Sequence, residues 1–169
     1  VTNAGVTSVA SNVGAFTLGG GITNSTNQIK LALNNATLQG SPSNPTGTSS
    51  GTAVMMGMGG TCTLTPVYSS RMRVSFHGGL QNNTANVATT HNLRYGTGAA
   101  PSNGAAATGT AALGNSVVTG STAVVTFPLS VEAIITGLTP GTAYWFDMSL
   151  LVGGGTATLA NVSCNAMEF

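Results

Sequence analysis

The sequence predicts an all-β protein, a jelly-roll-like antiparallel β-sandwich that follows an extended N-terminal segment. Three observations support this prediction. Charged residues make up only 4% of the chain, and recurring Gly, Thr and Val disfavour long helices. Several segments alternate apolar and polar residues with a period of two, as strands do. No segment has a helical period. A fibronectin type III or immunoglobulin-like sandwich is the alternative, because composition and period do not distinguish the two.

Residues 1–52 are predicted to form an extended fibre or attachment segment with short strands. Brief apolar alternations at 6–9, 15–18 and 29–33 are separated by Gly and Asn turn signals. In the segment 39–51 apolar residues do not recur at regular intervals, and the segment is rich in residue types that favour turns and flexible linkers. The domain boundary is therefore expected at 52/53, which leaves residues 53–169 for the sandwich.

The sandwich strands follow from the alternation of apolar residues. In 71–77, Met72, Val74 and Phe76 share one face, which should be the core face. In 124–135 the apolar side holds Val125, Phe127, Leu129, Val131, Ala133 and Ile135. Gly153 to Gly155 allow a tight turn between two closing strands. The predicted strands are 61–68, 71–77, 91–95, 124–135, 143–152 and 156–169, with 96–121 as a long surface excursion.

The predicted strand 144–152 is apolar on both faces, with Trp145 and Leu151 on the less apolar one. A strand of this kind is normally covered on both sides, and a sandwich covers only one. We expect a neighbouring subunit as the second cover, with the loop 96–121 of the same chain as the alternative. The candidate subunit-interface residues are Phe16, Leu18, Trp145 and Leu151.

The two cysteines, Cys62 and Cys164, lie far apart in the sequence and form no CxxC motif. This spacing does not fit the usual zinc or redox sites. Buried free thiols are expected in preference to a disulfide. In a jelly roll the first and last strands usually pair, which would bring the two cysteines onto neighbouring strands and keep a disulfide open.

The residue inventory argues against an enzyme. The only histidines are His77 and His91, and no serine lies in a G-x-S-x-G elbow. The acidic residues Glu132, Asp147 and Glu168 lie on predicted strands and are expected to pair with Arg71 or Arg73. No ligand pair has metal-site spacing. We therefore expect no catalytic residue, metal or cofactor.

Charge and hydropathy limit the partners. A formal net charge of +1 gives no electrostatic basis for binding nucleic acid. No apolar run reaches the roughly 18 residues of a membrane span. The sequence therefore predicts neither nucleic-acid binding nor insertion into a membrane.

Several segments resemble known families. Gly137 to Tyr144, GLTPGTAY, resembles the tyrosine corner of fibronectin type III domains, a turn that recurs in many β-sandwiches. Gly5 to Leu18, GVTSVASNVGAFTL, looks like linker segments of phage tail-fibre chains. Residues 93–101, 137–147 and 161–169 look like the C-terminal domains of phage structural proteins. This resemblance implies a trimeric virion fibre, from tail or head, with a jelly-roll-like head and other virion proteins as partners.

The leading functional hypothesis is a phage virion structural fibre protein that attaches to a host surface glycan or protein through exposed loops. Amide groups can pair with sugar hydroxyls. The candidate receptor-binding residues are Gln81, Asn82, Asn83, Asn86 and His91. The alternatives are a capsid decoration or cementing protein, in which the N-terminal residues clamp the capsid, and a glycan-binding adhesion module.

Overall fold

The computed structural model describes residues 22–25, 28–31 and 35–169. The chain divides into two units, Val1–Asn34 and Asn35–Phe169. In the first, β1 (Ile22–Ser25) and β2 (Gln28–Leu31) pair antiparallel. The predicted interface residues Phe16 and Leu18 lie outside the described residues.

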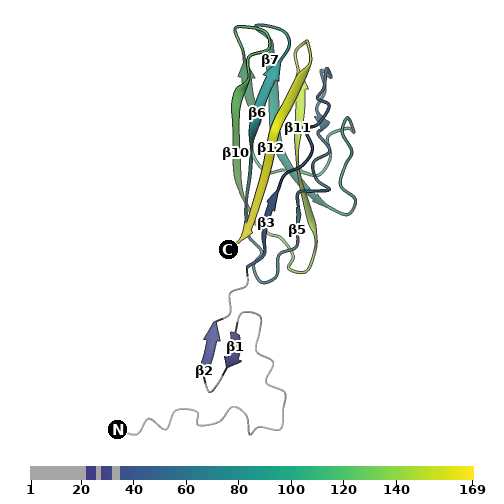
Figure 1. Ribbon diagram of the computed structural model, residues 1–169. Coiled ribbons are helices and arrows are strands. Elements are labelled where there is room, and N and C mark those ends of the chain that lie inside the picture. Colours follow the sequence, from purple (N-terminus) through teal and green to yellow (C-terminus); the bar gives the residue numbers. More distant parts are fainter. Residues whose placement is uncertain (1–21, 26–27, 32–34) are drawn as a thin grey trace, which may run out of the picture. The chain divides into compact units, whose positions relative to one another are not determined.

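The second unit is built from two antiparallel sheets, and the described residues contain no helix. The all-β sandwich prediction is confirmed. One sheet has the order β10-β6-β12-β3, and Figure 1 shows β10, β6 and β12 as long ribbons in one layer with the short β3 at its border. Its strands are β10 (Phe127–Ile135), β6 (Met72–Asn82), β12 (Ala157–Glu168) and β3 (Thr37–Gly40).

The other sheet is organised around β11 and β7, which pair along their lengths. Short strands border this pair: β4 and β5 add to β11, and β8 and β9 add to β7. The strands are β4 (Val54–Met55), β5 (Thr63–Leu64), β7 (Ala88–Thr97), β8 (Thr110–Ala111), β9 (Ser116–Thr119) and β11 (Tyr144–Val152).

The connections between the long strands cross from one sheet to the other. β6 leads to β7, β10 leads to β11, and β11 leads to β12, and each pair is split between the sheets. The first sandwich strand, β3, pairs with the last, β12. An immunoglobulin-like sandwich keeps its last two strands in one sheet. The connectivity therefore favours the jelly-roll interpretation.

The predicted core faces agree with the structure for the strongest strands. Met72, Val74 and Phe76 are buried, and β10 alternates buried and exposed residues from Leu129 to Ile135. Val125 is exposed, because β10 begins only at Phe127. These inward side chains fill the space between the sheets, which is the main source of stability in a sandwich.

Several predicted boundaries differ from the structure: β6 and β7 are longer than expected, β8 and β9 lie within the predicted loop 96–121, and two further differences have a clear cause. Residues 35–52 belong to the sandwich unit, because Thr37–Gly40 pairs with β12 and Thr48 bridges Ala157. The predicted strand 61–68 is reduced to β5, because Pro66 cannot donate to a ladder and the backbone N–H groups of the next three residues bind a side chain instead.

Cys62 and Cys164 form a disulfide, with their Cα atoms 6.2 Å apart. The expectation of free thiols is wrong. Cys62 precedes β5 in one sheet and Cys164 lies on β12 in the other, so the bond links the two layers. Gly40 lies opposite Cys164, and a Cβ atom at Gly40 would come within 2.7 Å of the Cys164 sulfur.

Candidate functional site

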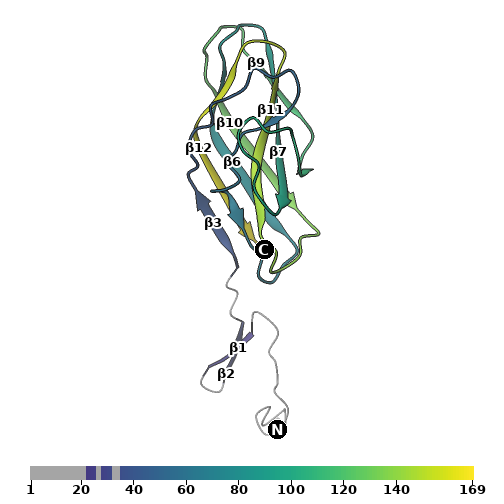
Figure 2. The ribbon, with the colours of Figure 1, turned by 90° about the vertical axis from the view of Figure 1, so that its right-hand side faces the viewer.

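The two ends of the sandwich are formed by different segments of the chain. At one end lie Asn35, the turn 66–70 and the C-terminal Phe169, and we call this the root end. At the other lie the loops 83–87, 120–126 and 153–156, and we call this the loop end. Figures 1 and 2 show the C-terminus at the root end and loops that connect the two sheets at the opposite end.

The loops at the loop end are joined to one another by backbone hydrogen bonds. The Asn86 N–H donates to the Gly120 carbonyl at 2.7 Å, and the Val124 N–H donates to the Asn82 carbonyl at 2.9 Å. Val124 has a φ of 63°, which is unusual for a β-branched residue. The loops therefore form one surface whose backbone shape is set by contacts between them.

Asn82 has a structural role at this end. Its Nδ2 donates to the Thr89 hydroxyl at 3.1 Å and to the Gly154 carbonyl at 3.2 Å. Its Oδ1 accepts from the Thr84 N–H at 2.9 Å. Because both ends of the amide are engaged, Asn82 shapes the surface and has little capacity for a ligand.

The other predicted amides keep free donors. The Asn83 Oδ1 accepts from the Thr156 N–H at 2.8 Å, and the Gln81 Oε1 accepts from the Thr126 hydroxyl at 3.1 Å. Among the described residues, the NH₂ groups of both side chains have no hydrogen-bond partner. Asn86 is exposed with a φ of 57°. Gln81, Asn83 and Asn86 therefore present unused polar groups at the loop end.

His91 differs from these residues because its side chain is buried. On β7 it shares the inner face with Leu93 and pairs with Leu150 of β11. Burial lowers the pKa of His91, and its Nδ1 has no partner within the described part of the chain. The structure therefore does not place His91 on the surface with the predicted amides.

A shallow hollow lies beside the loops, lined by residues of β6, β7, β9, the start of β10 and the loops, including Gln81, Thr84, Thr122 and Phe127. It encloses room for about one water molecule, far less than a small-molecule cavity needs. Val124 and Val125 next to it are exposed. This end can contact a ligand as a surface, whereas it cannot enclose one.

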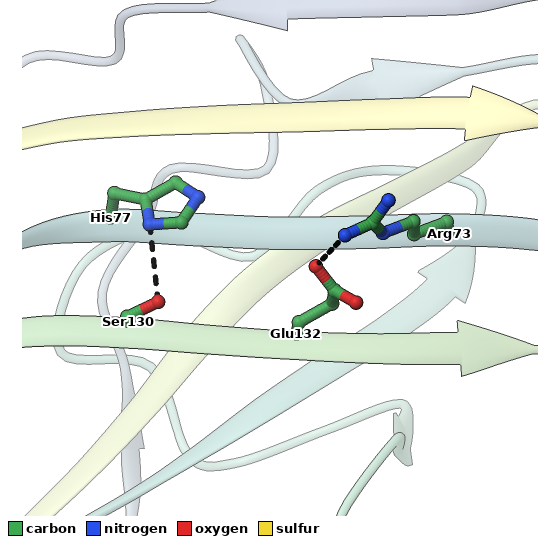
Figure 3. A network of polar contacts seen from close by, with 4 residues as sticks. All are labelled: Arg73, His77, Ser130 and Glu132. Atoms are coloured by element: carbon green, nitrogen blue, oxygen red, sulfur yellow. Dashed lines mark hydrogen bonds and ion pairs between the residues drawn. The ribbon is translucent and has the colours of Figure 1, made fainter.

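A second polar group lies on the exposed face of β6 and β10, shown in Figure 3. Arg73 donates to Glu132 at 2.6 Å, and the Ser130 hydroxyl and His77 Nδ1 are 3.3 Å apart. A Ser-His pair needs a carboxylate that orients the imidazole, but the Glu132 carboxylate binds Arg73. The hydrogen bond to Arg73 lowers the pKa of Glu132. The arrangement is that of a solvated sheet face.

Glu168, at the root end, is a buried carboxylate that binds backbone N–H groups. It accepts hydrogen bonds from Ala36, Val67, Tyr68 and Ser69. Burial acts to raise the pKa of Glu168, but these four donors outweigh burial and hold it at about 2. The prediction of an arginine partner is wrong for Glu168 and confirmed only for Glu132.

Asp147 is the other buried carboxylate and lies near the start of β11. It accepts from the N–H groups of Gly57 at 2.9 Å, Met58 at 3.2 Å and Met148 at 2.7 Å. Burial raises its pKa to about 6 in spite of these bonds. Asp147 therefore fixes the loop that leads to Cys62, and the predicted arginine partner is wrong here too.

Trp145 lies beneath segments of its own chain. Its ring packs against Gly96 and Gly109, and its Nε1–H donates to the Thr97 carbonyl at 3.2 Å. This cover is the loop alternative stated above, so Trp145 does not need a subunit to be buried. Leu151 is half-buried. The assignment of these residues to a subunit interface, and the trimer itself, stay predictions.

The hydroxyl of Tyr144 accepts a hydrogen bond from the Thr139 N–H at 3.0 Å. This contact has the form of a tyrosine corner, which packs a tyrosine back on the preceding turn. Among the described residues, no cluster of His, Cys, Asp and Glu could hold a metal ion, and no helix is long and apolar enough to span a membrane. Neither the family models nor the curated proteins contain a match to this chain.

Proposed function

We propose that this chain is a structural, fibre-type domain of a bacteriophage virion that contacts a host surface through its loop end. The observation that carries the proposal is the difference between the two ends of the sandwich. Asn35 and Phe169 lie at the root end, and the three joined loops lie at the other. A domain held at its root end would present these loops outward.

The chemistry of the loop end favours an uncharged polar ligand. Residues 81–88, 119–127 and 153–156 contain no charged side chain. The free NH₂ groups of Gln81 and Asn83 can donate to hydroxyl oxygens, and exposed Val124 adds apolar surface. A neutral host glycan fits this combination. Because charge plays no part, binding should change little with salt concentration.

Adsorption of fluorescently labelled chain to host cells tests the proposal. N83D and Q81E keep the acceptor oxygens that hold the loops and remove the free donors. We expect the double variant to bind at least about tenfold more weakly, because lost hydrogen bonds leave ligand oxygens unpaired. Q39E changes an exposed amide on β3 in the same way and should have no effect. Equal adsorption of all three proteins, or none by the wild type across candidate hosts, would contradict the proposal.

A further inference from the structure

One border of the sandwich is a long unpaired strand. β10 has nine residues, pairs with β6 and with no other strand of the described residues, and keeps a continuous register from Phe127 to Ile135. The other borders are short, because β3 and β9 have four residues each and β4, β5 and β8 have two. Figure 1 shows β10 at the side of its sheet. A long open edge offers backbone N–H and C=O groups to another strand.

We propose that two copies of this chain associate by antiparallel pairing of their β10 strands, which joins the two four-stranded sheets into one. This inference goes beyond the proposed function, because it concerns the side of the sandwich and makes no use of the loop end. It predicts a dimer in place of the trimer that the sequence resemblance implies.

The self-pairing register follows from the sequence of β10. Full overlap of the two strands places Val131 opposite Val131 of the second copy. On the inner face, Phe127 then lies opposite Ile135 and Leu129 opposite Ala133. Every inner pair is therefore apolar. Such cross-strand pairs stabilise antiparallel sheets.

The outer face is complementary in the same register. Ser130 lies opposite Glu132 of the second copy, so its hydroxyl can donate to the carboxylate. Pro128 lies opposite Ile134, whose side chain is 56% exposed in one chain. The charge of Glu132 is already balanced by Arg73 at 2.6 Å. The two Glu132 side chains lie diagonally across the new ladder, and Arg73 of each chain offsets their repulsion.

Pro128 is compatible with this pairing. A proline on an edge strand is placed with its missing N–H away from the neighbouring strand. Ser130 and Glu132 follow Pro128 by two and four residues, so their N–H groups also point outward, away from β6. In the proposed register they reach the carbonyls of Glu132 and Ser130 of the second copy, and only the ends of the ladder lose a bond.

Sedimentation equilibrium of the purified chain over a range of concentrations tests the pairing. One copy has a mass of 16.6 kDa, and we expect a reversible rise to twice this mass. S130E places a second carboxylate opposite Glu132 and should weaken the dimer about tenfold, whereas S130K should strengthen it by a similar factor. S130P removes an outward N–H and should abolish association.

T37E and T37K are the matched controls, because Thr37 is exposed on the opposite border of the same sheet. They should leave the dimer unchanged. Circular dichroism checks that each variant is folded. If S130P does not fold, S130E and S130K still test the proposal. A monomer at all concentrations, a trimer, or a dimer indifferent to Ser130 would overturn it. Cell adsorption, which depends on the loop end, would be unaffected by any of these outcomes.

Discussion

The root end and the loop end are held together by different chemistry. At the root end, Glu168 collects backbone N–H groups from two segments, and the Cys62–Cys164 bond joins the sheets. At the loop end, neutral amides and backbone groups join the loops. A covalent bond and ionic hydrogen bonds are stronger than neutral ones.

This difference indicates a division of roles. Substitutions at the root end should affect the stability of the whole sandwich, whereas substitutions at the loop end should act locally. A surface whose shape depends on single amides can also change its binding properties without loss of the fold. The following predictions test this contrast, from the largest expected effect to the smallest.

Removal of the disulfide should have the largest effect. C62S with C164S should lower the free energy of unfolding by about 4 kcal/mol, because the bond closes a loop of 102 residues in the unfolded chain. Urea denaturation measures the change. A reductant should destabilise the wild type and leave the double variant unchanged. Equal stability of the wild type and the double variant without reductant would show that the disulfide does not stabilise the root end.

Asp147 should make the protein more stable as the pH falls through 6. Its folded-state pKa of about 6 lies above the ordinary value of 3.8, so the folded state binds the proton more tightly than the unfolded state. The free energy of unfolding should rise by about 1–3 kcal/mol between about pH 7 and pH 4. D147N should lose this rise. A wild type with flat stability in this range would contradict the prediction.

Glu168 should show the opposite dependence on pH. Its pKa is lowered from 4.5 to about 2, so its contribution is complete above 4.5 and is lost as the pH falls towards 2. E168Q should cost about 2 kcal/mol at neutral pH, and its thermal midpoint should approach that of the wild type in acid. E132Q, at the exposed ion pair with Arg73, is the control and should change the midpoint little.

Asn82 tests the loop end. N82A removes the amide that joins Thr89, Gly154 and Thr84 and should cost about 1 kcal/mol. Hydrogen exchange should increase in residues 83–87 and 153–156 and not in β12. S121A is the control, since Ser121 is exposed in a neighbouring loop and its φ is not positive. Faster exchange at the root end would show that the two ends are coupled.

Val124 should give the smallest effect, and in the opposite direction. V124G relieves a φ of 63° and should raise the unfolding free energy by less than about 1 kcal/mol. A123G, at the neighbouring residue without positive φ, should lower it. Two variants with the same loss in thermal denaturation would contradict this account of the loop.

The sequence was sufficient for features that depend on local pattern. The existence and the core faces of β6 and β10 were predicted because large apolar residues alternate in them, whereas the end of β6 and the start of β10 were not. Gln81, Asn82, Asn83 and Asn86 lie together because they occupy the end of β6 and the short loop that connects it to β7. His91 was less predictable, since a polar residue can occupy an inward position of an alternating strand.

Features that depend on distant contacts were not predictable. Glu168 and Asp147 bind backbone N–H groups, which every residue except proline carries, so no residue type indicates the partner. The spacing of Cys62 and Cys164 gave no information about the bond, because the fold of the intervening strands brings them together. The loss of strand 61–68 has the same origin, since its backbone donors are used by Glu168.

The position of the disulfide also determines how the sandwich would respond to mechanical load. A pull on Asn35 against the loop end would act first on the β3–β12 ladder, which spans only four residues of β3. Once this ladder, the Thr48–Ala157 bridge, the pairing of β4 with β11 and the bonds of Gly57 and Met58 to Asp147 have separated, the chain could extend as far as Cys62. Beyond that residue the tension passes through the covalent bond into β12. The strands from β6 to β11 lie within the closed loop and would therefore be shielded from the force.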